Sequence, residues 1–156
     1  SYFPDYQFVI AGAPSLNIEF YKTFLSDNTT IIFDQTYNLL KIAEAALVTS
    51  GTATLETAIF NVPQVVCYKA GSLTYQIAKR LINVKFISLV NLILNKEAVA
   101  ELIQDDLNTN RISEELYKIL GSNKKQQLND YKRLRELLGG HGASAKTATL
   151  MLKTLN

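Results

Sequence analysis

A Ser-Gly-Thr turn at positions 50–52 is the part of the sequence whose residue types best suit the binding of an anion. It follows an apolar strand predicted over residues 46–49 and leads directly into a helix predicted to run to about Asn61. The free amide groups and the dipole of a helix N-terminus attract negative charge, and a glycine lets a phosphate come close to the backbone. Ser50 and Thr52 could add hydroxyl contacts to an oxyanion, or one of them could simply cap the helix.

Glu56 lies one helical turn after Thr52 and therefore on the same side of the predicted helix. A carboxylate at that place can accept hydrogen bonds from the two hydroxyls of a ribose, as acidic residues do in dinucleotide-binding folds. The alternative is that Glu56 only complements the positive end of the helix dipole.

A second group of polar residues follows the last predicted strand, at residues 85–89. Asn91 offers a donor and an acceptor that suit a sugar hydroxyl or a phosphate oxygen, or it could close a turn. Glu101 and Gln104 are three residues apart on a helix predicted over 97–105 and could face one ligand together. A solvent-exposed helix face is the alternative for these two.

A parallel sheet has to hold these residues. Short apolar runs without alternation, separated by amphipathic stretches of about ten residues, are typical of strands that are buried on both faces. Predicted strands cover residues 7–11, 30–33, 46–49, 64–68 and 85–89, and predicted helices cover residues 16–26, 36–44, 52–61 and 72–83. The fold class is therefore α/β, with a Rossmann-like parallel sheet and helices on both of its faces.

The character of the chain changes at about Lys96, where it becomes charged and amphipathic. This pattern predicts an all-helical tail over residues 97–105, 110–120, 123–138 and 143–155. With 156 residues in all, a single domain over 1–156 is expected.

Composition excludes several classes of function. Sixteen Lys and Arg against fourteen Asp and Glu leave a net charge of +2, too little for non-specific nucleic-acid binding, so nucleic acid is not an expected partner. One His, His141, and one Cys, Cys67, cannot supply the four ligands of a structural zinc site, and no metal or other cofactor is expected. Cys67 lies in an apolar strand and should be a small buried hydrophobe rather than a nucleophile.

The sequence contains no apolar run of about 18 residues and no secretion leader, so neither a membrane span nor export is expected. The first residue is Ser1 rather than a methionine, which suggests a processed product or a piece of a longer protein.

Six blocks of the sequence follow one another in an informative order and spacing. They are residues 48–56, 63–69, 73–75, 77–81, 88–93 and 101–104, which read VTSGTATLE, PQVVCYK, LTY, IAKRL, SLVNLI and ELIQ. In this order they resemble the lipid-A-disaccharide synthase family, and the likeness extends from about Tyr6 to the glycine-rich turn at residues 139–140 and the closing helix. The chain departs from the family pattern at Val90, where a proline usually precedes the asparagine.

The resemblance implies an inverting glycosyltransferase of the GT-B type, with two Rossmann-like domains, of which this chain looks like the C-terminal, donor-binding one. Such an enzyme transfers diacylglucosamine from UDP-2,3-diacylglucosamine to 2,3-diacylglucosamine 1-phosphate (lipid X), releases UDP and needs no cofactor. The implied donor site has seven substrate-binding residues, namely Ser50, Gly51, Thr52, Glu56, Asn91, Glu101 and Gln104. In it the 50–52 turn would stabilise the departing diphosphate and Glu56 would hold the ribose.

The family's N-terminal domain, with its acidic candidate for the general base, is absent from this chain, as is the first Gly-Ser-Arg strand and loop of the donor domain. The resemblance therefore implies no catalytic residue in this chain, which alone should be inactive. Because the substrates are acylated, it also implies work at the cytoplasmic face of the bacterial inner membrane, by peripheral association.

Two other classes of function stay open on the residues alone. A phosphosugar isomerase-type domain also grips a phosphate with a Ser- and Thr-rich turn, but it would need a second such loop and a base beside carbon two of the sugar. A non-catalytic, flavodoxin-like binding module would show no preference for uridine nucleotides.

Overall fold

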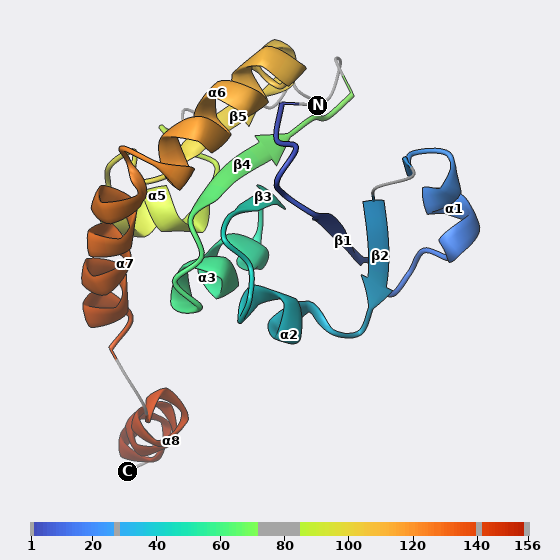
Figure 1. Ribbon diagram of the computed structural model, residues 1–156. Coiled ribbons are helices and arrows are strands. Elements are labelled where there is room, and N and C mark those ends of the chain that lie inside the picture. The colour runs from blue at the N-terminus through green and yellow to red at the C-terminus, as the bar shows by residue number, and fades with distance from the viewer. Residues whose placement is uncertain (1, 27–28, 72–84, 140–141, 155–156) are drawn as a thin grey trace. The chain divides into compact units, whose positions relative to one another are not determined.

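The computed structural model describes residues 2–26, 29–71, 85–139 and 142–154 (Figure 1). The chain forms two compact units, residues 1–44 and 45–156. The helix predicted over residues 72–83 and the lone His141 lie outside the described residues.

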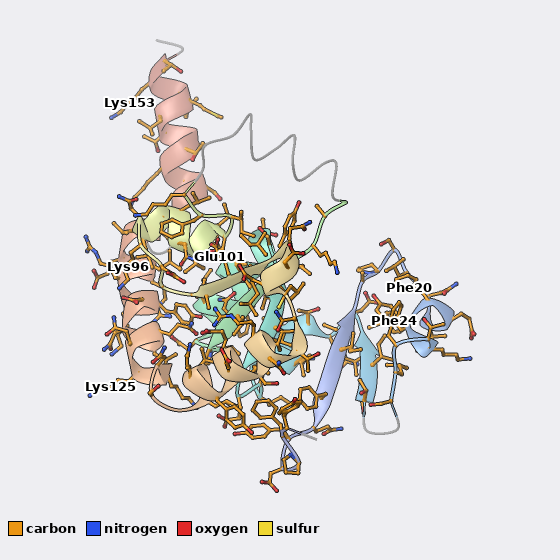
Figure 2. The ribbon with its side chains drawn as sticks, turned by 90° about the horizontal axis from the view of Figure 1, so that it is seen from above. Phe20, Phe24, Lys96, Glu101, Lys125 and Lys153 are labelled. Carbon is orange, nitrogen blue, oxygen red and sulfur yellow. The ribbon has the colours of Figure 1, made fainter. Side chains whose placement is uncertain are left out.

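The first unit is a two-stranded parallel sheet with two short helices. Its elements are β1 (Phe8–Gly12), α1 (Ile18–Lys22), β2 (Thr29–Phe33) and α2 (Thr36–Leu40). The helices are shorter than predicted, since α1 begins after Asn17, whose side chain caps it, and ends at Lys22. The ring of Tyr21 packs edge-on against Phe33 with ring centroids 5.9 Å apart, which joins α1 to β2. Phe20 and Phe24, labelled in Figure 2, also contact one another, and both are exposed.

The second unit contains a three-stranded parallel sheet in the order β3 (Ala46–Thr49), β4 (Gln64–Tyr68), β5 (Ala100–Ile103). Val65 and Val66 in the central strand have no exposed surface. Because successive strand residues point to opposite faces, β4 is covered on both faces. This confirms the α/β class with a parallel sheet that helices flank.

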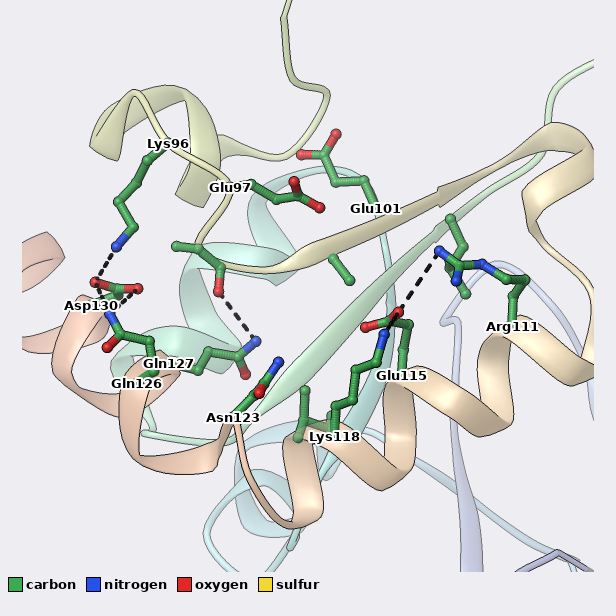
Figure 3. A pocket seen from close by; sticks show the side chains of 14 residues that line it. Lys96, Glu97, Glu101, Arg111, Glu115, Lys118, Asn123, Gln126, Gln127 and Asp130 are labelled. Carbon is green, nitrogen blue, oxygen red and sulfur yellow. Dashed lines mark hydrogen bonds and ion pairs between the residues drawn. The ribbon is translucent and has the colours of Figure 1, made fainter.

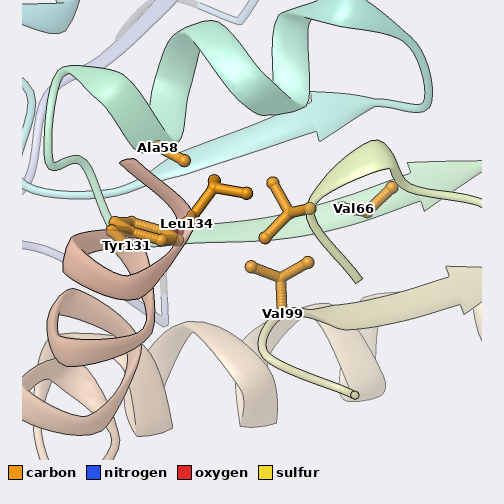
Figure 4. Close-up of a cluster of buried hydrophobic side chains, with 6 residues drawn as sticks. Ala58, Val66, Val99, Tyr131 and Leu134 are labelled. Atoms are coloured by element: carbon orange, nitrogen blue, oxygen red, sulfur yellow. The ribbon is translucent and has the colours of Figure 1, made fainter. Parts of the chain in front are cut away.

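The helices of the second unit are α3 (Thr52–Ile59), α5 (Leu89–Leu94), α6 (Thr109–Leu120), α7 (Lys124–Leu138) and α8 (Ala143–Thr154). One face of the sheet packs against α3, α5 and α7 (Figure 4), and the buried core there consists of Ala58, Val66, Val90, Val99, Tyr131 and Leu134. Helix α6 contacts β4 and β5, and its buried Leu116 and Ile119 are apolar. The long helices α6, α7 and α8 confirm the helical character of most of the tail.

Two predicted elements were wrong. Residues 97–105 do not form a helix, because residues 100–103 pair with β4 as the edge strand β5 and only a short 3₁₀ turn, η1 (Gln104–Asp106), follows. Residues 85–89 do not form a strand, because Ser88 accepts a hydrogen bond from the amide of Asn91 and starts helix α5. In both places long-range pairing and capping outweigh the local pattern.

Among the described residues, no helix has the length and apolar character that crossing a bilayer requires.

Candidate functional site

The turn between β3 and α3 has the open form that anion binding requires. Gly51 is the N-cap of α3, with φ 143° and ψ −161°, a backbone conformation that is open only to glycine at low cost. No side chain in the described part of the protein caps the helix. The alternative that Ser50 or Thr52 serves as an ordinary N-cap is therefore wrong. The amide of Thr54 donates to the carbonyl of Gly51 at 3.3 Å, and the amides of Thr52 and Ala53 precede the hydrogen bonds of the helix.

Thr52 lies at the first position of α3 and is exposed. Its hydroxyl makes no hydrogen bond to any residue that the structure describes, whereas the hydroxyl of Thr54 turns inward and donates to the carbonyl of Gly51 at 2.8 Å. Thr54 thus steadies the turn from the protein side, and Thr52 presents its hydroxyl on the outer side.

Ser50 has a partner inside the protein. Its Oγ donates to the carbonyl oxygen of Ile87 at 2.8 Å, a contact between residues 37 positions apart. A serine hydroxyl has one proton to donate. While that proton is given to Ile87, Ser50 cannot also donate to a phosphate oxygen, so the backbone amides and Thr52 remain as the donors at this turn.

Glu56 lies on α3, one turn after Thr52, and is half-buried. Its carboxylate makes no hydrogen bond or ion pair with any of the described residues. The structure therefore leaves this carboxylate available to hydroxyl groups of a ligand bound at the start of α3.

Asn91 lies in the first turn of α5 and not at a strand end, and it has no exposed surface. Its Nδ2 donates to the carbonyl of Val99 and to Glu101, both at 2.8 Å, and its Oδ1 accepts from the amides of Ala98 at 2.7 Å and Val99 at 3.0 Å. All four hydrogen-bonding positions of the side-chain amide are thus used within the protein. Asn91 ties α5 to the start of β5.

Glu101 lies in strand β5, level with Val66 of β4, and not on a helix. Its carboxylate accepts hydrogen bonds from the backbone amides of Ile87 and Ser88, each at 2.9 Å, and from Asn91. Glu101 is half-buried, and Figure 2 shows it near the middle of the second unit, whereas Lys125 projects at the edge of this unit.

Gln104 begins η1 directly after β5, and its side chain contacts the backbone of Ala70 rather than open solvent. The sequence predicted Glu101 and Gln104 on one face of a helix over residues 97–105. That prediction was wrong, since Glu101 lies in β5 and Gln104 begins η1. Both join β5 to chain segments that flank residues 72–84.

A cavity of about 510 Å³ lies elsewhere, between β5 and the helices α6 and α7 (Figure 3). Two ion pairs lie among its charged side chains: Lys96 pairs with Asp130 at 2.8 Å, and Lys118 pairs with Glu115 at 2.7 Å. Glu101 is the one predicted site residue among those that line it. The ion pair of Glu115 and Lys118 can be anticipated from the sequence, since the two residues are three positions apart on one helix. The ion pair of Lys96 and Asp130 joins residues 34 positions apart, and no local spacing indicates it.

The Cys67 thiol is not suited to act as a nucleophile. Burial raises the pKa of the Cys67 thiol to about 11, so the thiol is protonated at neutral pH. Among the described residues, no three His, Cys, Asp or Glu side chains gather closely enough to hold a metal ion.

Comparison with known proteins assigns the chain to a family. The family model described as lipid-A-disaccharide synthetase matches residues 6–154. A protein named lipid-A-disaccharide synthase from Geobacter sulfurreducens is 34% identical over 158 residues, which cover 98% of this chain and 41% of that protein. Proteins of the same name from Psychromonas ingrahamii and Syntrophus aciditrophicus are 40% and 41% identical, over 87% and 78% of this chain. The chain spans 37% and 32% of their lengths.

Proposed function

The chain belongs to the lipid-A-disaccharide synthase family, and on this premise we propose that it forms the donor-binding domain of such an enzyme. The proposed donor is UDP-2,3-diacylglucosamine. The full enzyme would transfer its diacylglucosamine to lipid X with inversion and release UDP, and this domain, residues 1–156, would be the C-terminal half of a GT-B fold.

The observation that supports this proposal most directly is the uncapped N-terminus of α3. The amides of the first turn, the glycine backbone at position 51 and the exposed hydroxyl of Thr52 all lie at the carboxyl end of β3. In open α/β sheets, ligands bind outside the carboxyl ends of the strands. A diphosphate is the ligand group that this combination of donors fits best.

The same donors would contribute to the reaction. Negative charge grows on the β-phosphate as UDP departs, and amides that already point at that oxygen stabilise the charge without having to reorganise. In this role the Gly51 and Thr52 turn acts on the leaving group, and we place the general base outside this chain.

Glu56 would bind the two ribose hydroxyls of the uridine. We expect Glu56→Ala to weaken the binding of UDP to the full-length protein by about 1.5–3 kcal/mol, the range for hydrogen bonds to charged groups. Isothermal titration calorimetry measures this directly. Glu97→Ala is the matched control, since Glu97 is an exposed glutamate away from α3 and should leave UDP binding unchanged. Equal affinities of wild type and Glu56→Ala would show that the ribose role is wrong.

The remaining predicted residues would affect donor binding indirectly. Asn91, Glu101 and Gln104 each bond to protein groups in the structure. We propose that they shape the site rather than contact the donor.

Because both substrates carry acyl chains, we also propose that the full enzyme works at the inner face of the bacterial inner membrane as a peripheral protein. A thermal-shift panel of UDP, UMP, sugar phosphates and FMN tests the proposal against its rivals. Stabilisation by UDP above all others is expected. A preference for sugar phosphates would favour an isomerase-type domain, and a response to FMN alone would favour a flavodoxin-like module.

A further inference from the structure

A continuous series of hydrogen bonds connects β5 to the turn at the start of α3. Glu101 Oε2 accepts from the amide of Ile87 at 2.9 Å, and the carbonyl of the same residue accepts from Ser50 Oγ at 2.8 Å. Strands β3 and β5 lie on opposite sides of β4 and do not pair with one another. The link from Glu101 through Ile87 to Ser50 therefore joins two parts of the sheet edge that the strand ladder leaves separate.

The Glu101 end of this link is rigid. The other carboxylate oxygen, Oε1, accepts from the amide of Ser88 at 2.9 Å and from Asn91 Nδ2 at 2.8 Å. Both Ser88 and Asn91 have no exposed surface. Three short hydrogen bonds hold the carboxylate in one orientation, and with it they place the backbone at Ile87.

The Ser50 end of the link adjoins the least constrained part of the turn. Gly51 has no side chain, and an added Cβ there would meet no atom of the described residues within 4 Å. Among the residues that the structure describes, no side chain caps α3. In the described part of the chain, two side-chain hydrogen bonds thus orient the turn: that of Thr54 to the Gly51 carbonyl and that of the Ser50 hydroxyl to Ile87.

We propose that Glu101 is a positioning residue, which through the backbone of Ile87 and the hydroxyl of Ser50 holds the 50–52 turn in the conformation that binds the diphosphate. This inference rests on the proposed function. Breaking the link lowers the fraction of molecules whose turn is competent to bind, and the apparent affinity falls by that fraction. Glu101 and Ser50 then act as one unit, whereas Thr52, as a direct contact, acts independently.

A double-mutant cycle on UDP affinity in the full-length protein distinguishes these roles. Glu101→Gln keeps the size of the side chain but turns an amide NH₂ toward a donor, and Ser50→Ala removes the hydroxyl. Each variant should weaken UDP binding about tenfold, and the double variant should again show about tenfold, because the same link is broken in all three. Thr52→Ala combined with Glu101→Gln is the matched control, and there the two losses should multiply to about a hundredfold. Losses that multiply for Glu101 and Ser50 as well would overturn the link.

Hydrogen exchange, followed by mass spectrometry without ligand, provides a second measurement. Peptides covering residues 50–59 should exchange faster in Glu101→Gln and in Ser50→Ala, and at the wild-type rate in Thr52→Ala. Peptides from α7 should be unchanged in all three. Equal acceleration in α7 would mean that Glu101 only stabilises the fold, and the inference would be wrong. A wild-type protein that does not bind UDP would overturn the proposed function, and the exchange rates would still decide whether Glu101 orients the turn.

Discussion

Gln104 and Ala70 are joined by two hydrogen bonds that continue the pairing of β5 with β4 beyond the ends of both strands. The amide of Ala70 donates to Gln104 Oε1 at 2.7 Å, and Gln104 Nε2 donates back to the carbonyl of Ala70 at 3.1 Å. The side-chain amide thus takes the place of a backbone peptide. Gln104 itself adopts φ 53°, in the left-handed region. A non-glycine residue in that region carries a cost, which these two bonds offset.

Gln104→Ala should therefore lower the free energy of unfolding by about 1–3 kcal/mol, the sum of two ordinary hydrogen bonds. Urea denaturation measures this. Gln104→Gly loses the same two hydrogen bonds, but glycine has no Cβ and adopts the left-handed region without a steric penalty. This variant should therefore be less destabilising than the alanine variant, by about 1 kcal/mol. If alanine and glycine gave the same midpoint, the left-handed backbone would carry no cost at this residue.

The sequence predicted the parallel sheet well because its strands are apolar and short, and because Gly51 stands where a strand meets a helix. It failed at β5 because Ala100, Glu101 and Leu102 all favour helices, and only the pairing with β4 shows them to be a strand.

The candidate site was predictable in the same uneven way. The 50–52 turn and Glu56 are contiguous in sequence, so local reasoning placed them on one helix start. Ser50 and Glu101 both form hydrogen bonds to Ile87, which lies 37 and 14 positions away, respectively. The periodic pattern of apolar residues in a sequence does not reveal contacts between residues so far apart.

Gly51→Ala tests whether the turn needs glycine for its backbone. An alanine Cβ would have room there, so the cost comes from φ 143° alone. We expect the free energy of unfolding to fall by about 1–3 kcal/mol. Thr52→Ala is the control: its exposed hydroxyl has no partner in the described part of the protein, so stability should stay within about 0.5 kcal/mol of wild type. A Gly51→Ala protein as stable as wild type would show that the backbone conformation at position 51 does not require glycine.

Tyr131 should make stability fall at high pH. Burial raises the pKa of this fully buried tyrosine well above its usual value, and a hydrogen bond from Gln64 offsets part of the rise. The unfolded chain releases the proton above about pH 10 while the folded protein keeps it, so the free energy of unfolding falls with pH there, by at most about 1.4 kcal/mol per pH unit.

Tyr131→Phe provides the comparison. At neutral pH it should be less stable than wild type by about 1–2 kcal/mol, since Gln127 Oε1 loses the hydroxyl that donates to it at 3.0 Å. Above pH 10 that difference should shrink, because only the wild type carries the titrating hydroxyl. Urea denaturation between pH 8 and about pH 11 measures both trends. A difference that stays constant over this range would show that Tyr131 does not titrate abnormally.

Cys67 should react slowly with alkylating reagents, in keeping with its place in β4. Its pKa of about 11, against an ordinary value of 9.0, results from desolvation by burial. At pH 8 the thiolate fraction in the folded protein should then be about a hundredth of that in the unfolded chain, and the thiolate is the reactive form. Iodoacetamide labelling, followed by mass spectrometry, should accordingly be about a hundredfold slower in buffer than in denaturing urea at the same pH. Cys67→Ser removes the one cysteine of the chain and so defines the background. Equal rates in buffer and in urea would mean that the thiol is accessible and ionises freely, and that this strand opens far more often than its packing implies.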